Sequence, residues 1–123
     1  MPPKASDPND KLEQELRRGV IVLAALSQLR AWQYGYSLRQ ALAARGMAIE
    51  EGTLYPLLRR LETQGVLASE WRIEDGPPRR YYKLSPAGRA LYGRLIQNWN
   101  NLVGVVSDLI ADDDSKRKKE GGR

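Results

Sequence analysis

The chain has 123 residues and a net charge of +5, because its 20 lysines and arginines outnumber its 15 acidic residues. This length suits one domain with a modest core. The chain has no cysteine and no histidine, which excludes disulfides, thiolate metal sites and histidine-based acid–base catalysis. We therefore expect neither an enzyme nor a cofactor. The basic excess favours an acidic partner, and nucleic acid is the usual one.

Neither a membrane span nor a signal peptide is predicted. The chain contains no run of about 18 apolar residues, the length at which a helix could cross a bilayer. The first ten residues, MPPKASDPND, lack the apolar stretch of a signal peptide. We expect a cytoplasmic protein, in which residues 1–9, with three prolines, form a disordered arm.

Apolar residues at helical spacing predict three helices in the first half of the chain. Their expected ranges are 10–30, 36–44 and 51–64. Residues 31–34 are expected to be a plain connection, and Gly46 and Gly65 to end the second and third helices. Two helices joined by a short glycine-containing turn predict a helix-turn-helix.

A β-hairpin is predicted directly after the third helix. Residues 66–73 and 79–84 are rich in strand-forming residues, and the stretch 74–78 between them holds a Gly-Pro-Pro turn. A hairpin in this place makes the helix-turn-helix a winged one. The predicted fold class is therefore mostly α with a small β-hairpin, and the winged helix-turn-helix domain spans residues 10–84.

A long helix is predicted to follow. Ser85 and Pro86 form a strong start, an N-cap serine followed by proline at the first helical position. The helix is expected to end near Ala111, where three aspartates oppose its dipole. We expect a dimerisation helix over 85–111 and a disordered charged tail over 112–123, whose basic run either stays free in solvent or adds weak DNA affinity.

The third predicted helix has two distinct faces. Leucines cluster on one side, and a surface of small or cationic residues lies opposite, with Tyr55 on its flank. The residues of that outer surface are Gly52, Thr53, Pro56, Arg59, Arg60 and Thr63. Such a surface suits the DNA major groove, where arginine bonds guanine edges or phosphates. The alternative is a solvated face whose arginines pair with Glu62 or other acids.

The hairpin offers a second candidate contact with DNA. Arg79 and Arg80 follow its turn, and an arginine on a wing reaches the adjacent minor groove or its phosphates. Charge that protects an edge strand from aggregation is the alternative. Tyr81 and Tyr82 alternate, so one should pack inward and the other outward.

The last predicted helix carries a wide apolar stripe. Its residues recur at spacings of three and four, and they are Tyr92, Leu95, Ile96, Trp99, Leu102, Val103, Val106, Leu109 and Ile110. A helix this long extends beyond a core of this size, so the stripe calls for a partner helix. Self-association is the economical solution, and a two-fold dimer would match a palindromic operator. Packing within one chain is the alternative.

Several motifs together resemble one family of regulators. They are Tyr34-Gly35-Tyr36, the segment from Gly52 to Glu62, Gly65, Trp71, the segment from Gly76 to Tyr82, and Leu84-Ser85-Pro86-Ala87-Gly88. In this order, over residues 11–110, they are similar to the PadR family. The resemblance implies a homodimeric winged-helix repressor that binds a palindromic operator in double-stranded DNA. It departs at Glu50, where the family commonly has a serine or asparagine cap.

The resemblance also implies which residues contact DNA. The third helix would lie in the major groove with the wing alongside. By the resemblance, Thr53, Tyr55, Pro56 and Arg59 would contact the groove and Arg79 would be the wing contact. With three further candidates added, the predicted DNA-binding residues are Tyr36, Thr53, Tyr55, Pro56, Arg59, Arg60, Arg79 and Arg80.

Trp99 resembles the tryptophan at the dimer centre of the short, multidrug-responsive PadR-type repressors, where a symmetric pair brackets flat aromatic ligands. The positions implied for an effector site at the dimer interface are Leu16, Val20, Ala24, Ile96, Trp99 and Val103. The multidrug regulator has an acidic group where this chain has Val103, so the comparison does not imply a preference for cationic drugs. Alternatively, Trp99 only fills an apolar interface.

Three functions compete at this point. The first is a homodimeric DNA-binding repressor released by a planar aromatic effector. The second is a winged-helix module that binds another protein, and the third is a ligand-binding scaffold with incidental catalysis. Binding to the DNA upstream of the chain's own gene would separate the first from the second.

Overall fold

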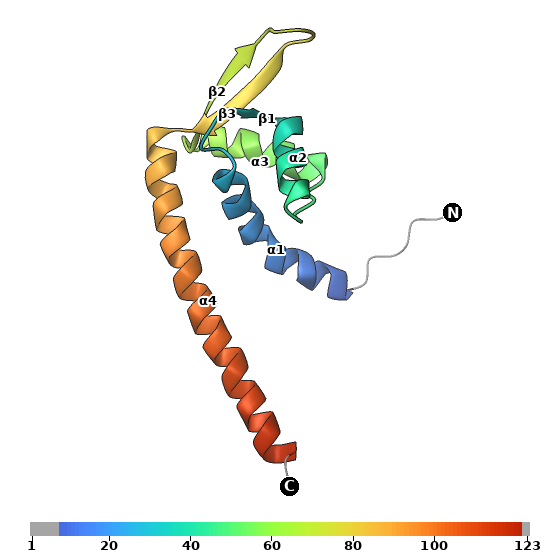
Figure 1. Cartoon of the computed structure of the whole chain (residues 1–123), viewed down its shortest axis with the longest axis vertical. Coiled ribbons are helices and arrows are strands. Elements are labelled where there is room, and N and C mark those ends of the chain that lie inside the picture. Colours follow the sequence, from blue (N-terminus) through green and yellow to red (C-terminus); the bar gives the residue numbers. More distant parts are fainter. Residues whose placement is uncertain (1–7, 122–123) are drawn as a thin grey trace, which may run out of the picture. The chain divides into compact units, whose positions relative to one another are not determined.

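The computed structural model describes residues 8–121, with side chains described for residues 8–112. In this range the elements are α1 (Pro8–Ser27), β1 (Gln33–Tyr34), α2 (Gly35–Ala44), α3 (Glu51–Thr63), β2 (Leu67–Arg72), β3 (Arg79–Leu84) and α4 (Pro86–Gly121) (Figure 1). The chain divides into two compact units, Met1–Tyr92 and Gly93–Arg123, and α4 runs from the first into the second. The predicted class is confirmed: a mostly helical winged helix-turn-helix followed by a long helix.

The core of the first unit is assembled mainly from leucines. Leu26 and Leu29 come from α1 and the turn after it, Leu38 from α2, and Leu54 and Leu58 from α3, and all five are fully buried. Burying one such side chain is worth about 1.5–3 kcal/mol. The leucine face predicted for the third helix therefore packs inward, and this fixes which face of α3 stays outside.

The helices of the helix-turn-helix end at glycines, as predicted. Gly65 has φ +79°, and its N–H donates to the Glu62 carbonyl while the Val66 N–H donates to Leu61. This pair of bonds satisfies carbonyls that the end of α3 would otherwise leave free, and it requires a left-handed residue. Gly46 ends α2 with the same pattern at φ +92°. These turns set the direction in which the chain leaves each helix.

The sheet has three strands in the order β1-β3-β2, all antiparallel. The predicted hairpin is present, with Trp71 opposite Arg80 and Arg72 opposite Arg79. The expectation of a plain connection over 31–34 is wrong, because Gln33 and Tyr34 pair with Tyr82 and Tyr81 as strand β1. Two residues are too few to show alternation in a sequence. The added strand joins the beginning of α2 to the wing.

The predicted start of α4 is confirmed by hydrogen bonds. The Ser85 hydroxyl accepts a bond from the Gly88 N–H at 2.9 Å, as an N-cap does. The same residue also bonds the Gly65 and Val66 carbonyls at the end of α3. A Cβ at residue 88 would overlap the Val66 carbonyl oxygen. The first turn of α4 is therefore fixed tightly against the entry to β2.

Three helix ends differ from the prediction by more than one residue. α1 ends at Ser27 instead of near residue 30. α1 begins at Pro8, inside the expected arm, because proline is tolerated in the first turn of a helix. α4 continues to Gly121 instead of ending near Ala111, since residues 112–120 include neither proline nor glycine to stop it. The rest of the predicted arm, residues 1–7, lies outside the described residues.

Within residues 8–121, no helix is long and apolar enough to cross a membrane.

Candidate nucleic-acid interface

The outer surface of α3 is exposed in the places that the sequence predicts. Thr53, Pro56, Arg59 and Arg60 are exposed, and Tyr55 is half-buried. Pro56 lies inside the helix and lacks the N–H that would bond the Gly52 carbonyl. The surface therefore combines small residues with two guanidinium groups that can approach a partner closely.

The start of α3 is weakly capped. Glu50 occupies the N-cap, and its side chain makes no hydrogen bond to the first turn. A serine or asparagine would normally satisfy one of the free N–H groups there. The first-turn N–H groups of Gly52 and its neighbours thus lack a side-chain acceptor from the cap, next to the surface just described.

A groove of about 540 Å³ lies between α3 and the wing. Five of the eight predicted DNA-binding residues line it: Tyr36, Tyr55, Arg59, Arg79 and Arg80. Tyr55 reaches this groove because residue 35 is glycine, where a Cβ would lie 2.5 Å from the Tyr55 ring. The groove also contains Trp71, which is 65% exposed and which the sequence reasoning did not assign to this surface.

Two arginines of the groove carry uncompensated charge. Among the side chains described, the ion pairs are Arg72–Glu70 and Arg80–Glu62, so neither Arg59 nor Arg79 has an acidic partner. The Arg79 guanidinium lies 4.6 Å from the centroid of the Tyr34 ring, which holds the side chain without neutralising it. Both guanidinium groups can therefore bind an anion.

Arg80 has a different role in the structure. Its Nη2 donates to Glu62 Oε1 at 2.5 Å, and the Ser69 hydroxyl donates to the other carboxylate oxygen of Glu62. The hydrogen bond from Arg80 lowers the pKa of Glu62 below its ordinary value, and the bond to Glu62 raises the pKa of Arg80. The predicted alternative, in which Glu62 pairs with Arg59 or Arg60, is absent from the described side chains. Arg80 thus joins β3 to α3.

The two tyrosines after the wing arginines alternate as predicted. Tyr82 is buried and faces α3, and burial raises the pKa of its hydroxyl. Tyr81 is half-buried on the other face, where its ring lies 5.4 Å from that of Tyr34 and carries the Arg72 guanidinium at 4.3 Å. These contacts stiffen the wing.

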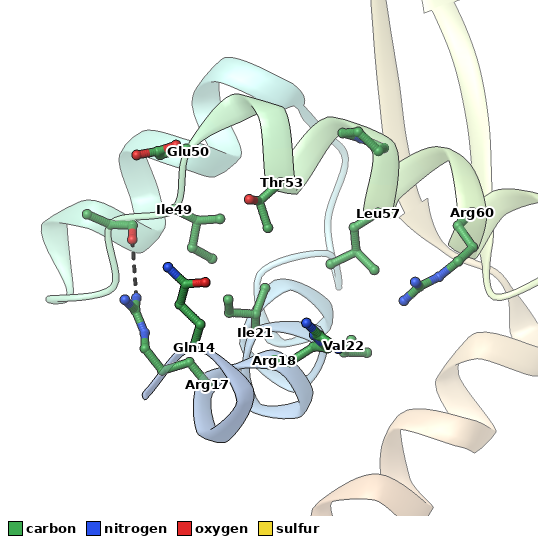
Figure 2. Close-up of a pocket in the computed structure, with 12 residues that line it drawn as sticks. Gln14, Arg17, Arg18, Ile21, Val22, Ile49, Glu50, Thr53, Leu57 and Arg60 are labelled. Atoms are coloured by element: carbon green, nitrogen blue, oxygen red, sulfur yellow. Dashed lines mark hydrogen bonds between the residues drawn. The ribbon is translucent and has the colours of Figure 1, made fainter. Parts of the chain in front are cut away.

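The other three predicted residues, Thr53, Pro56 and Arg60, line a second groove, between α1 and α3. Its volume is about 610 Å³. Figure 2 shows the side chains that line it. Arg17 and Arg18 of α1 also line it, and the sequence reasoning did not assign them a role. Arg18 lies on the side of α1 opposite Leu16, so the helical spacing could have singled it out, whereas Arg17 follows Leu16 directly and flanks the apolar stripe.

The predicted effector residues form one stripe on each of two helices. On α1, Leu16 is exposed while Val20 and Ala24 are half-buried. On α4, in the second unit, the exposed fractions of Ile96, Trp99 and Val103 are 36%, 42% and 42%. Each stripe leaves apolar surface uncovered in the single chain.

Comparisons with known proteins agree with this architecture. The model of the transcriptional regulator PadR-like family matches residues 22–94, more than half of the chain. A PadR-family regulator from Eggerthella lenta is 44% identical with a TM-score of 0.77, over 82% of this chain and 90% of that one. A PadR-like regulator from Bacillus cereus is 26% identical with a TM-score of 0.69, over 78% of this chain and 96% of that one.

A curated relative is also a regulator by name. A transcriptional regulator of Mycobacterium tuberculosis is 51% identical over 57 residues, which are 46% of this chain and 53% of that protein. The match therefore spans about half of the relative's length. PadR-like regulators are DNA-binding proteins, and from the family model together with the shared fold we conclude that this chain belongs to the PadR-like family of transcriptional regulators.

Proposed function

We propose that the chain is a homodimeric, sequence-specific DNA-binding repressor. The observation that carries this proposal is the groove between α3 and the wing, in which Arg59 and Arg79 lie together without an acidic partner among the described residues. Unpaired guanidinium groups beside tyrosine hydroxyls are a suitable surface for phosphates. Membership of a family of DNA-binding regulators supports the same partner.

The groove suits one particular part of DNA. A helix in the major groove and a wing in the adjacent minor groove must straddle the sugar–phosphate strand between them. That strand would occupy the groove, with the Tyr36 and Tyr55 hydroxyls and Arg79 at its phosphates. The exposed Trp71 ring would cover a sugar. Arg80, held by Glu62, would position the wing rather than contact DNA itself.

Base recognition is assigned to the outer surface of α3. Thr53, Pro56 and Arg59 are exposed there, and Gly52 lets the helix approach the base edges. An arginine that bonds guanine in two places discriminates against other bases by about 1–3 kcal/mol. Arg59 is the best placed residue for this contact, because it lines the groove and also lies on the outer face.

A homodimer would double this surface. The exposed apolar stripe of α4, which includes Trp99, Leu102 and Val106, needs a partner, and a second copy supplies an identical one. Two recognition helices related by a two-fold axis would bind a palindromic operator.

A planar aromatic effector is proposed at the dimer interface around Trp99. The ring is 42% exposed and has Ile96 and Val103 on the same side of α4. The test is fluorescence of a variant in which Trp32 and Trp71 are replaced by phenylalanine, so that Trp99 is the sole tryptophan, with excitation at a wavelength that tyrosine does not absorb. Quenching by planar aromatics such as acridines is expected. An unquenched Trp99 would mean that the ring only packs.

The test of DNA binding is fluorescence anisotropy with duplexes from the intergenic DNA upstream of the gene. Arg59→Ala should weaken specific binding by about 1–3 kcal/mol, and affinity should fall steeply with salt. Arg94→Ala, which removes the same charge from an exposed site on α4, should have little effect. Salt-insensitive or absent binding would instead favour a module that binds another protein.

A further inference from the structure

The groove between α1 and α3 has a cationic rim. Arg17 and Arg18 of α1 and Arg60 of α3 line it, and Glu50 is the acidic residue among its lining residues. Figure 2 shows Glu50 at the end of the groove opposite Arg60, whose side chain extends from α3 toward α1. The charge around the groove is therefore unevenly distributed, and it is most positive at the Arg60 end.

Two of these arginines have no partner in the part of the chain whose side chains are described. Arg17 donates to the Ala48 carbonyl at 3.3 Å, but neither Arg18 nor Arg60 makes an ion pair or hydrogen bond there. Two cations that face one groove repel each other, and an anion between them would relieve this repulsion and accept charge-assisted hydrogen bonds.

The floor of the groove is apolar. Leu57 and Ile49 are buried, and Ile21 and Val22 are half-buried. A DNA phosphate would use the rim but gain nothing from this floor. A ligand with an apolar body and one anionic end would use both, and a volume of about 610 Å³ is ample for it.

This groove is separate from the apolar stripe of α1, which includes Leu16 of the predicted effector site. Gln14, Arg18 and Ile21 line the groove, whereas Leu12 and Leu16 lie on the opposite side of α1. A partner helix packed on Leu16 would therefore leave the groove open to a small ligand.

We propose that the groove between α1 and α3 binds a small amphiphilic organic anion, with a carboxylate or sulfonate between Arg18 and Arg60 and an apolar body over Ile21, Val22 and Leu57. Arg60 and Thr53 also belong to the proposed DNA surface, so the ligand would compete with DNA. The competition with DNA rests on the proposed function, whereas the ligand-binding site itself does not.

The test is a titration of ¹⁵N-labelled full chain with octanoate, followed by NMR. Shifts should concentrate on residues that line the groove. Octanol and octyltrimethylammonium, which keep the alkyl chain but lack the anion, should bind more weakly. Arg18→Gln and Arg60→Gln should each lower the affinity for octanoate by about tenfold or more. Arg94→Gln, the charge-matched control on α4, should leave this affinity unchanged.

Three results would overturn the proposal. Octanoate shifts confined to α4 around Trp99 would place the anion on the other apolar surface. Equal binding of octanoate and octanol would remove the role of the arginines. A loss of DNA affinity and of salt dependence in Arg18→Gln, with octanoate affinity unchanged, would make this residue a phosphate contact and not a ligand contact. Because the titration contains no DNA, a failure of DNA binding would leave its result intact.

Discussion

At the scale of single residues, Glu62 connects three elements. It belongs to α3, accepts a hydrogen bond from Ser69 of β2 and pairs with Arg80 of β3. The Glu62 carboxylate therefore ties both strands of the wing to α3, and it helps to hold the groove that Arg59 and Arg79 line. The network of Glu62, Ser69 and Arg80 is therefore structural, and Arg59 and Arg79 are the arginines of the groove that are left to bind DNA.

Glu62→Gln tests this network. Its bonds lower the pKa of Glu62 from 4.5, so the ionised group stabilises the fold above that value and loses its effect as pH falls through the lowered pKa. The free energy of unfolding of the variant should be about 1 kcal/mol lower than that of wild type at pH 7, and this difference should shrink in acid. Urea unfolding at pH 7 and at pH 3 measures both.

Glu70→Gln is the matched control for that experiment. Glu70 pairs with Arg72 on the exposed side of the wing, where a salt bridge is worth roughly 0–1 kcal/mol. Equal losses of unfolding free energy in the two variants would show that the Glu62–Arg80 pair contributes no more than a surface ion pair.

At the scale of elements, two glycines of α4 have opposite surroundings. A Cβ at residue 88 would overlap the Val66 carbonyl oxygen, whereas a Cβ at residue 93 meets nothing within 4 Å. Gly88→Ala should therefore destabilise the chain, by about 1–3 kcal/mol as for other overpacked sites. Gly93→Ala should stabilise it by roughly 0.5–1 kcal/mol, because alanine is the better helix former. Thermal unfolding of both variants distinguishes a real close approach from general intolerance of change in this helix.

Helices were easier to predict than the sheet. The ends of α2 and α3 follow from Gly46 and Gly65, and the start of α4 from Ser85, because these residues bond the backbone locally. Strand β1 was missed, since it is defined by its pairing with β3 and not by its own two residues. The far end of α4 was placed too early, because the dipole penalty of three aspartates is small beside the propensity of the whole stretch.

The candidate site was predicted in part. Helical spacing gave the outer face of α3, and the turn gave the place of Arg79. Spacing alone could not show that Arg60 turns toward α1 while Arg59 turns toward the wing, because that depends on which elements flank α3. The partner of Glu62 was open for the same reason, as Arg80 is distant in sequence and close only in the fold.

At the scale of the whole molecule, the proposed dimer decides how DNA is bound. One winged helix offers one short recognition surface, and linking two of them makes the second contact intramolecular, which raises affinity by about 10²–10⁴. The exposed apolar residues that would form this link lie on α4, among them Trp99, Leu102 and Val106. Their exposure in the single chain is what a second copy would remove.

Val106→Glu should therefore separate dimerisation from folding. A charge in the middle of the stripe is costly to bury without a partner, so sedimentation should show a monomer. The first unit does not include residue 106, so its far-UV circular dichroism and its tyrosine environment should stay close to wild type. Affinity for a palindromic operator should fall by about 100-fold or more, whereas affinity for a half-site should change little.

Asn101→Glu makes the same charge change on the opposite, exposed side of α4 and should leave both the dimer and the operator affinity unchanged. If Val106→Glu remained a dimer, another surface would have to hold the two copies together. If it became a monomer but bound the palindrome as tightly as wild type, the chain would read DNA as independent single domains, and the two-fold arrangement would have no part in recognition.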